Sequence, residues 1–211
     1  MFQNIRDEIT RNIRELKIWT SCLGENEDFY VISRGLFFVY AYGIYEEVIR
    51  KVISATIHEL NCANVTIDKC IYELYDLIFS KEYDALYHVG SEHKWDKRWQ
   101  ISEKLQQNPL MSIDANTFPT DGKNLRYRQL NSLATSFGIR GSVLPRSEIG
   151  GYITELVDNR NDIAHGNKTP KEVGRNYTKD NLLDRCDYVS EVCIYIADSY
   201  EKYITEKNYL R

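Results

Sequence analysis

Apolar residues recur at intervals of three and four along most of the chain, which is the spacing of one face of an α-helix. The clearest stripe consists of Phe2, Ile5, Ile9, Ile13 and Leu16. It predicts a first helix that ends near Gly24. The same spacing persists from Phe29 to Leu60 without a cluster of turn residues. It predicts one long helix there, because strands of this length are rare.

Further helices are predicted downstream by the same spacing. They cover Asp68–Phe79, Lys81–Tyr87, Lys94–Gln107, Leu125–Phe137, Arg146–Ala164 and Thr178 to about Lys207. The turn formers of Asn108–Asn124 predict a surface loop. At Thr169–Glu172, a Thr, a Pro and a Glu three residues after the Thr form the signature of a capped helix start. The pattern therefore predicts an all-α protein with no sheet beyond an incidental hairpin.

Composition is compatible with one sizeable core, since 43% of the 211 residues are hydrophobic. A single domain is the expectation. The chain lacks an uninterrupted apolar stretch of about 18 residues. Its first sixteen residues include several charged ones, where a signal peptide would be apolar. We expect a cytoplasmic protein with no membrane partner. The five cysteines include no C-x-x-C pair, which predicts reduced thiols, with Cys186 and Cys193 sharing a buried helix face.

Motifs for metals and cofactors are missing from the sequence. It contains no H-x-x-x-H, no phosphate-binding G-x-x-x-x-G-K-[ST], no G-x-G-x-x-G and no G-x-S-x-G. His58 and Cys62, four residues apart, make at most half a metal site. We therefore expect neither a metal nor a cofactor.

The segment "RNDIAHG" (Arg160–Gly166) interrupts an apolar stripe with a charge. Ile149, Ile153, Leu156, Arg160 and Ala164 follow steps of four and three, so Arg160 occupies a position where an apolar residue is expected. An unpaired buried charge costs several kcal/mol, so the guanidinium needs an anionic partner from protein or ligand. A surface pair with Glu155 or Asp158 is the plainer alternative.

Asn161 and His165 share a ridge beside Arg160. His165 stands in the last turn, just before Gly166, the natural left-handed cap. The negative end of the helix should favour the protonated imidazole and move its titration toward or above neutrality. His165 as a mere cap residue is the alternative.

"RNDIAHG" resembles the R-x4-6-H motif of the HEPN superfamily of helical domains. Three more stretches are similar to such proteins in the same order: "YGIYEEVIRKVI" (Tyr42–Ile53), "NLRYRQLNSLATSFGI" (Asn124–Ile139) and "NLLDRCDYVSEVCIYIADSYEKYI" (Asn181–Ile204). The resemblance implies a HEPN-type four-helix bundle core with additional helices, inserted at about residues 62–124. It also implies a homodimer that brings two motifs together and cleaves RNA without a metal.

In that scheme Arg160 binds the scissile phosphate and His165 moves the proton of the ribose 2′-hydroxyl or of the leaving oxygen. Asn161 orients the histidine or the phosphate. Glu46 matches the family's helix acid and is the favoured partner of Arg160, with Glu47 as the alternative. Family members that are controlled by adenylylation carry Tyr two residues after the His, where this chain has Asn167.

Positive charge brackets the motif, although the net charge of the chain is −4. Gly122–Ser147 holds five basic residues and no acidic one, and Gly166–Lys179 holds four basic residues against Glu172. Such a patch suits phosphate binding. The predicted RNA-binding residues are Arg126, Arg128, Arg140, Arg146, Lys168, Lys171 and Arg175, beside Lys123 and Lys179. Tyr127, Phe137 and Tyr177 could stack unpaired bases, or belong to the core instead.

Two classes of function follow. The first is a metal-independent endoribonuclease that cuts cellular RNA as a toxin or antiphage defence effector, restrained by an antitoxin or other regulatory partner. The second is a non-catalytic dimer that binds nucleotides or RNA as a sensor or scaffold. An intact Arg and His favour the first, since a scaffold needs no tuned histidine.

Overall fold

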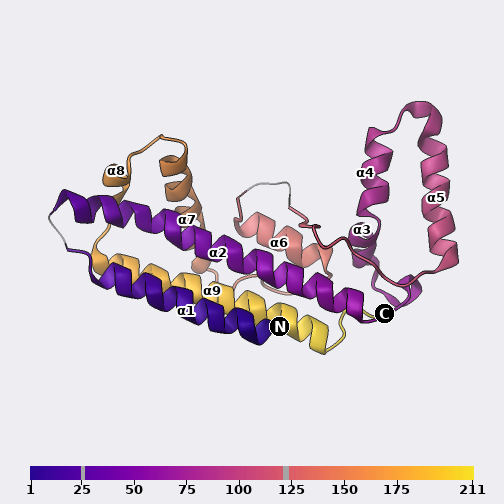
Figure 1. Ribbon diagram of the computed structural model, residues 1–211, viewed down its shortest axis with the longest axis horizontal. Coiled ribbons are helices and arrows are strands. Elements are labelled where there is room, and N and C mark those ends of the chain that lie inside the picture. Colours follow the sequence, from indigo (N-terminus) through magenta and orange to yellow (C-terminus); the bar gives the residue numbers. More distant parts are fainter. Residues whose placement is uncertain (25–26, 121–123) are drawn as a thin grey trace. The chain divides into compact units, whose positions relative to one another are not determined.

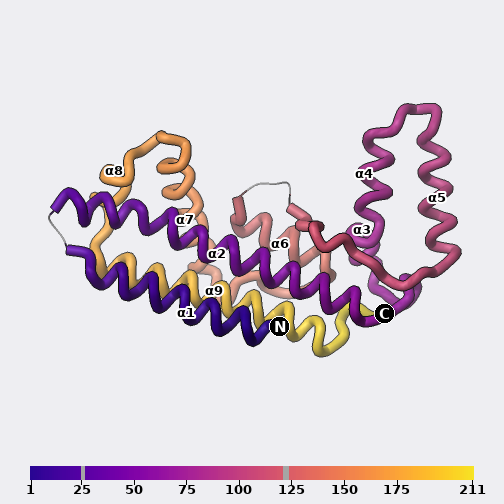
Figure 2. Tube along the Cα trace, viewed as in Figure 1, coloured from indigo at the N-terminus to yellow at the C-terminus, as the bar shows by residue number. Residues whose placement is uncertain are grey.

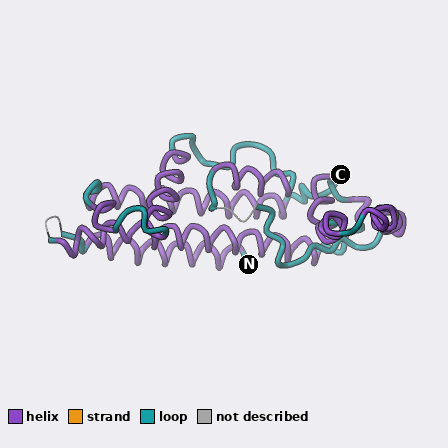
Figure 3. Tube along the Cα trace, turned by 90° about the horizontal axis from the view of Figure 1, so that it is seen from above, coloured by secondary structure: helices purple, strands orange, loops and turns teal. Residues whose placement is uncertain are grey.

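The computed structural model describes residues 1–24, 27–120 and 124–211, and within them it is built from helices and loops (Figures 1 and 3). The α-helices are α1 (Phe2–Ser21), α2 (Asp28–Cys62), α3 (Tyr75–Ile78), α4 (Ser80–His88), α5 (Lys94–Gln107), α6 (Tyr127–Ser136), α7 (Ile149–Ala164), α8 (Pro170–Gly174) and α9 (Lys179–Thr205). Extended pairing in the described part is limited to two isolated bridges, Thr66 with Leu110 and Cys70 with Leu210. The all-α prediction is confirmed.

The chain divides into two compact units. The first comprises residues 1–52, 121–131 and 142–199, and the second comprises residues 53–120, 132–141 and 200–211. Three helices, α2, α6 and α9, contribute residues to both units. Most of the stretch expected as an insertion, residues 62–120, lies in the second unit.

The first unit is a helical bundle in which α1, α2, α7 and α9 surround the core, as in a HEPN-type bundle (Figure 2). The apolar stripe of α1, from Phe2 to Leu16, is buried as its spacing predicted. Ion pairs join the outer faces of the helices: Arg6 of α1 pairs with Asp198 of α9, and Lys51 of α2 pairs with Glu8 of α1. The core therefore comes from helical stripes that the sequence already displays.

The close contact between α2 and α8 depends on two glycines. A Cβ at Gly35 would stand 1.9 Å from the carbonyl oxygen of Pro170, and one at Gly174 would stand 1.8 Å from that of Val31. Such distances are far below van der Waals contact, so no side chain fits at either position. The two glycines thus let the backbones touch and hold the segment that follows α7 against α2.

The helix predicted over Asp68–Phe79 is wrong for its first half. Two 3-10 turns, η1 (Ile67–Lys69) and η2 (Tyr72–Leu74), precede the short α3. Cys70 and Ile71 are extended, because their backbones pair with the end of the chain: the Ile71 N–H donates to the Tyr209 carbonyl at 3.0 Å. A contact from the far end of the chain thus replaces the helix.

The surface loop predicted over Asn108–Asn124 is wrong in its centre. Met111 and Ile113 are buried, and their N–H groups donate to the Val65 carbonyl and to the Asn61 side chain at 2.7 and 2.8 Å. Residues 121–123 of this stretch, with Lys123, lie outside the described residues. The loop therefore serves partly as core of the second unit.

All five cysteines are free thiols. Cys186 and Cys193 are both buried in α9, as their spacing of seven predicted. Burial raises the pKa of Cys186 to about 11 and raises that of Cys193 as well. Both thiols are therefore protonated near neutral pH and act as small apolar core residues.

Candidate functional site

Arg160 lies on the buried face of α7, as the sequence predicted. Ile149, Ile153 and Leu156 of that face are buried, and Arg160 follows one turn later, half-buried. Its position is thus the point where an apolar helix face meets the surface. The guanidinium must find its partners among the residues around it.

Those partners are two amides and an aromatic ring. Nη1 of Arg160 donates to Oδ1 of Asn124 at 3.1 Å and to Oδ1 of Asn161 at 2.9 Å. The guanidinium carbon lies 4.7 Å from the centre of the Tyr42 ring on α2. Among the described residues, no carboxylate pairs with Arg160. The groups that orient its charge are therefore neutral.

The acids weighed for Arg160 are engaged elsewhere. Glu46 pairs with Arg50 at 2.9 Å and Glu47 pairs with Lys51 at 2.8 Å, each along α2. The expectation that either one holds Arg160 is therefore wrong, because a basic residue one turn away on the same helix takes each carboxylate. The plainer alternatives fail in the same way. Glu155 pairs with Arg185 and Asp158 with Arg126.

Tyr42 and Asn124 form the floor beneath the guanidinium. The Tyr42 hydroxyl accepts from the Leu125 N–H at 3.3 Å and donates to Asn124 Oδ1 at 3.5 Å. Burial raises the pKa of Tyr42, so the phenol stays neutral. Asn124 was missed as a site residue, because it precedes Arg160 by 36 positions and follows no spacing rule.

His165 caps α7 and stands at the surface. Its N–H donates to the Asn161 carbonyl at 2.9 Å, and its side chain is exposed. Gly166 follows with φ of +72°, the left-handed cap that the sequence predicted. Asn161 thus touches both motif residues: its amide oxygen accepts from Arg160 and its carbonyl from the His165 backbone.

The segment after His165 is tightly tied. Lys168 pairs with Asp162 at 2.6 Å, and that contact lowers the pKa of the Asp162 carboxyl. The Thr169 hydroxyl accepts from the Glu172 N–H, while the Glu172 carboxylate accepts from the Thr169 N–H at 2.7 Å. The predicted capping box is therefore confirmed. It fixes the loop that starts at His165.

Most basic residues expected to bind RNA have acidic partners. Arg126 pairs with Asp158 at 2.5 Å and Arg146 with Glu191 at 2.6 Å, while Lys168 is held by Asp162. Lys171 pairs with Asp28 at 2.6 Å, and Arg140, in the second unit, lies 3.9 Å from Glu73. Arg128 and Arg175 are exposed. The local positive charge is thus smaller than the sequence count, because acids outside the two counted segments offset it.

Of the three aromatics considered for base stacking, Tyr127 is exposed at the start of α6. Phe137 is fully buried against Tyr200 and Tyr203 of the second unit, so of its two predicted roles the core one is confirmed. Tyr177 is half-buried, and its hydroxyl donates to Glu155 at 2.9 Å. Of these three aromatic residues, Tyr127 is the one whose ring is broadly exposed to solvent.

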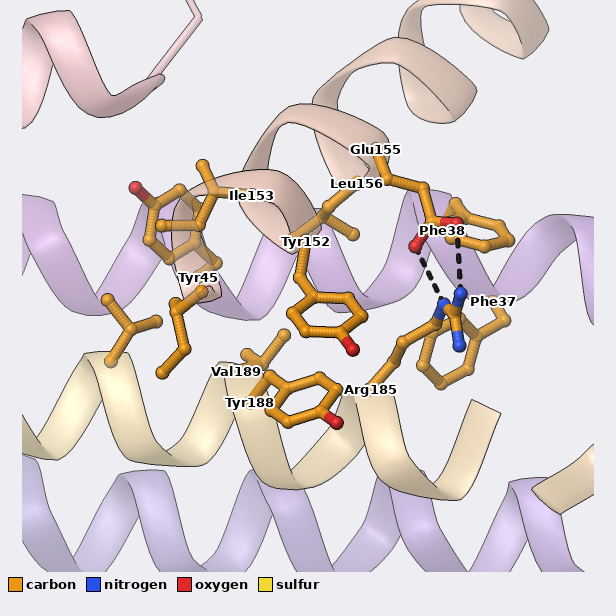
Figure 4. Close-up of a pocket in the computed structure, with 12 residues that line it drawn as sticks. Phe37, Phe38, Tyr45, Tyr152, Ile153, Glu155, Leu156, Arg185, Tyr188 and Val189 are labelled. Atoms are coloured by element: carbon orange, nitrogen blue, oxygen red, sulfur yellow. Dashed lines mark hydrogen bonds and ion pairs between the residues drawn. The ribbon is translucent and has the colours of Figure 1, made fainter. Parts of the chain in front are cut away.

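A second cluster joins α7 to α9 (Figure 4). Nε and Nη2 of Arg185 donate to the two carboxylate oxygens of Glu155 at 2.8 and 2.9 Å, and the Tyr152 and Tyr188 rings stack at 3.9 Å. The cavity among these residues has a volume of about 20 Å³. That is room for about one water molecule, not for a nucleotide. The cluster therefore braces the helix that carries Arg160.

The described residues contain no group of three His, Cys, Asp or Glu side chains arranged to hold a metal ion. Over the same residues, no helix has both the length and the apolar character needed to cross a membrane.

Comparison with known proteins supports the assignment that the motif suggested. The profile of one protein family, RiboL-PSP-HEPN, matches residues 2–202. The searches of curated proteins and of solved structures gave no significant match. Because the matched region covers nearly the whole chain, including α2, the Arg160 motif and α9, the protein belongs to the RiboL-PSP-HEPN family of the HEPN superfamily.

Proposed function

We propose that this protein is a metal-independent endoribonuclease that cuts cellular RNA, acting as a toxin or antiphage defence effector under the control of an antitoxin or other regulatory partner. Membership of a superfamily with ribonuclease-type domains supports this class of function. One observation carries the proposal further. Arg160 is half-buried, and no carboxylate among the described residues offsets its charge.

The hydrogen bonds of Arg160 leave one edge of the guanidinium available. Both bonds to amide oxygens come from Nη1. Nε and Nη2, which form the fork that binds phosphate with two parallel hydrogen bonds, donate to none of the described residues. The neutral partners orient this fork and leave its positive charge uncompensated. A phosphodiester would supply the anion that the site lacks.

His165 provides the proton transfer. The 2′-hydroxyl of the ribose loses its proton and attacks the adjacent phosphorus, the bond from phosphorus to the 5′-oxygen breaks, and that oxygen takes up a proton. The products are a 2′,3′-cyclic phosphate and a 5′-hydroxyl. An exposed imidazole can both accept and donate a proton, which is what these two transfers require. Asn161 positions Arg160 rather than the histidine, given its side-chain contact at 2.9 Å.

A single histidine cannot act as base and acid at once, so the reaction calls for a second copy of the site. The face of α2 opposite the core offers a place for that copy. Its exposed residues are Phe29, Ile32, Leu36, Val39, Tyr40 and Gly43. They follow steps of three and four with no charge among them, so a second identical helix face can cover them. Tyr42, whose ring contacts the guanidinium of Arg160, lies just beside this stripe.

Glu46 lies one turn after Tyr42 on α2, and its carboxylate pairs with Arg50. Its role in catalysis stays a prediction. Since it does not touch Arg160, Glu46→Gln should alter cleavage far less than Arg160→Ala.

RNA cleavage in the presence of EDTA tests the proposal. The wild type should cut RNA and leave 2′,3′-cyclic phosphate ends. His165→Ala should lose about 10²-fold or more in kcat while it retains RNA binding, and Arg160→Ala should weaken both. His58→Ala, another exposed histidine, is the matched control and should cut like the wild type. If RNA is cut only with added metal, or if His165→Ala keeps full activity, the nuclease proposal fails and the function becomes that of a non-catalytic RNA-binding dimer.

A further inference from the structure

The helical hairpin of α4 and α5 has surface chemistry that the cleavage site does not use. Neither helix contains a buried residue. The hairpin is closed by the pair of Lys104 with Glu82 at 2.5 Å, and the Lys104 ammonium lies 5.0 Å from the centre of the Phe79 ring. The two helices therefore have a fixed pairing but leave most of their side chains at the surface.

One face of α5 is aromatic. Trp95 and Trp99 stand one turn apart with exposures of 60% and 62%, and their ring centres are 6.3 Å apart. The guanidinium carbon of Arg98 lies 4.8 Å from the centre of the Trp95 ring. Two tryptophans that stay in water this fully bury little on folding, so folding of this chain does not explain their presence.

The helical spacing places only polar residues beside the two rings. Ser102 and Gln106 follow Trp95 and Trp99 on the same face, while Lys94 and Arg98 form one edge of it. Asp96 and Glu103 form the other edge. Of the aliphatic residues of α5, Leu105 lies on the same edge as Lys94 and Arg98, six positions after Trp99, and Ile101 lies beyond that edge, so neither stands next to both rings. The face thus combines two flat rings, uncharged hydrogen-bonding groups and one positive border.

We propose that the face of α5 formed by Trp95, Trp99, Ser102 and Gln106 binds unpaired bases of single-stranded RNA by stacking. Every base has a flat face that can lie on an indole ring, and cations along one edge attract the phosphates of the same strand. The acidic border keeps the backbone on the Lys94 and Arg98 side. The class of ligand rests on the proposed ribonuclease function, for which this face is a second contact with the substrate.

A protein partner fits the face less well. Protein interfaces at exposed tryptophans usually add aliphatic neighbours that pack around the rings, and the aliphatic residue of α5 on this side, Leu105, lies six positions after Trp99 at the edge of the face. Its polar residues are instead of the kind that bond to base edges.

Binding to a 2′-deoxy oligothymidylate of about 12 nucleotides tests the face apart from catalysis, because that probe has no 2′-hydroxyl to react. In the presence of EDTA, the probe should quench the tryptophan fluorescence of the full-length wild type. Trp95→Ala and Trp99→Ala should each raise Kd about tenfold, and Trp99→Phe should restore most of the affinity. Arg98→Ala should lower the dependence of Kd on salt. Leu105→Ala, on the same helix, is the control and should bind like the wild type.

Each outcome decides one of the two proposals. If the double variant Trp95→Ala/Trp99→Ala binds the probe within twofold of the wild type, the stacking face is overturned, and a changed sedimentation of that variant would assign the face to a protein contact. If the double variant loses affinity while the wild type cuts no RNA, the stacking face stands and the nuclease fails. Circular dichroism of each variant establishes that the helices are retained.

Discussion

The guanidinium of Arg160 rests on the ring of Tyr42, 4.7 Å from its centre, and both are held by Asn124. We expect Tyr42→Leu to reduce kcat/KM for RNA about tenfold, because the ring that supports the cation is lost. Tyr42→Phe keeps the ring and loses only the hydroxyl contacts, so its kcat/KM should stay within a few-fold of the wild type. Steady-state kinetics with thermal unfolding of both variants checks this. Equal losses in the two would rule out the ring as the support.

Asn124→Asp places a carboxylate where the amide oxygen now accepts from Arg160 at 3.1 Å. The new ion pair should offset the charge that the phosphate needs, so RNA affinity should fall about tenfold or more while thermal stability is kept or raised. Titration of RNA into the variant, together with its unfolding temperature, measures both effects. Unchanged affinity would show that the charge of Arg160 is not used for RNA.

Gly174→Ala tests the contact between α8 and α2. Its Cβ would overlap the Val31 carbonyl at 1.8 Å, so we expect a loss of about 3 kcal/mol in the free energy of unfolding. Gly151→Ala in α7 is the control. Nothing lies within 4 Å of its Cβ, so it should be neutral or stabilise the helix by up to about 1 kcal/mol. Chemical denaturation measures the free energy of unfolding of both variants. Equal values would contradict the close approach of the α8 and α2 backbones.

The capping box gives a pH-dependent contribution to stability. Hydrogen bonds from the Thr169 backbone and hydroxyl lower the pKa of Glu172 below 4.5 in the folded state. A lowered folded pKa means that the contribution is present above the unfolded pKa and is lost as pH falls through the folded pKa. Wild type should thus unfold at a higher temperature than Glu172→Gln at pH 7, and the gap should shrink as the pH falls through the folded pKa of Glu172. A gap that stays the same size as the pH is lowered would contradict the assignment.

Leu36→Glu tests the apolar stripe on α2. A charge in the middle of a self-associating face should weaken the dimer, and with it cleavage, by about tenfold or more, because the buried carboxylate would be unpaired. Leu110→Glu, an exposed leucine in the second unit, should leave both unchanged. Sedimentation over a range of concentrations and cleavage assays on the same samples provide the measurement. An active wild-type monomer at micromolar concentration would oppose the dimer.

The sequence predicted what depends on local spacing. The 3.6-residue period located α1, α2 and α9 and placed Arg160 on the buried face of α7, since both properties are read within one helix. It could not predict the partners of Arg160. Asn124 reaches it from 36 residues away, and Glu46, which the resemblance to the HEPN superfamily suggested, pairs with Arg50 one turn further along α2.

Long-range pairing also explains the other differences. The segment at Cys70 has helical spacing, but bridging to Leu210 requires an extended backbone. Likewise, a count of basic residues cannot reveal that Arg146 is matched by Glu191, 45 positions later. The spacing of residues in one sequence does not reveal such contacts. The predictions therefore overestimated the length of the helix at Cys70 and the charge of the positive patch.

The sharing of α2, α6 and α9 between the two units restricts how such a protein can change. No single cut in the chain separates the units, and a deletion of either one would sever three helices. Neither unit could therefore be produced alone with all of its helices whole. Variation in the α4–α5 hairpin is the exception, because both of its ends enter and leave within one unit. Descendants of this gene can thus lengthen, trade or lose that hairpin while the rest is inherited as a whole.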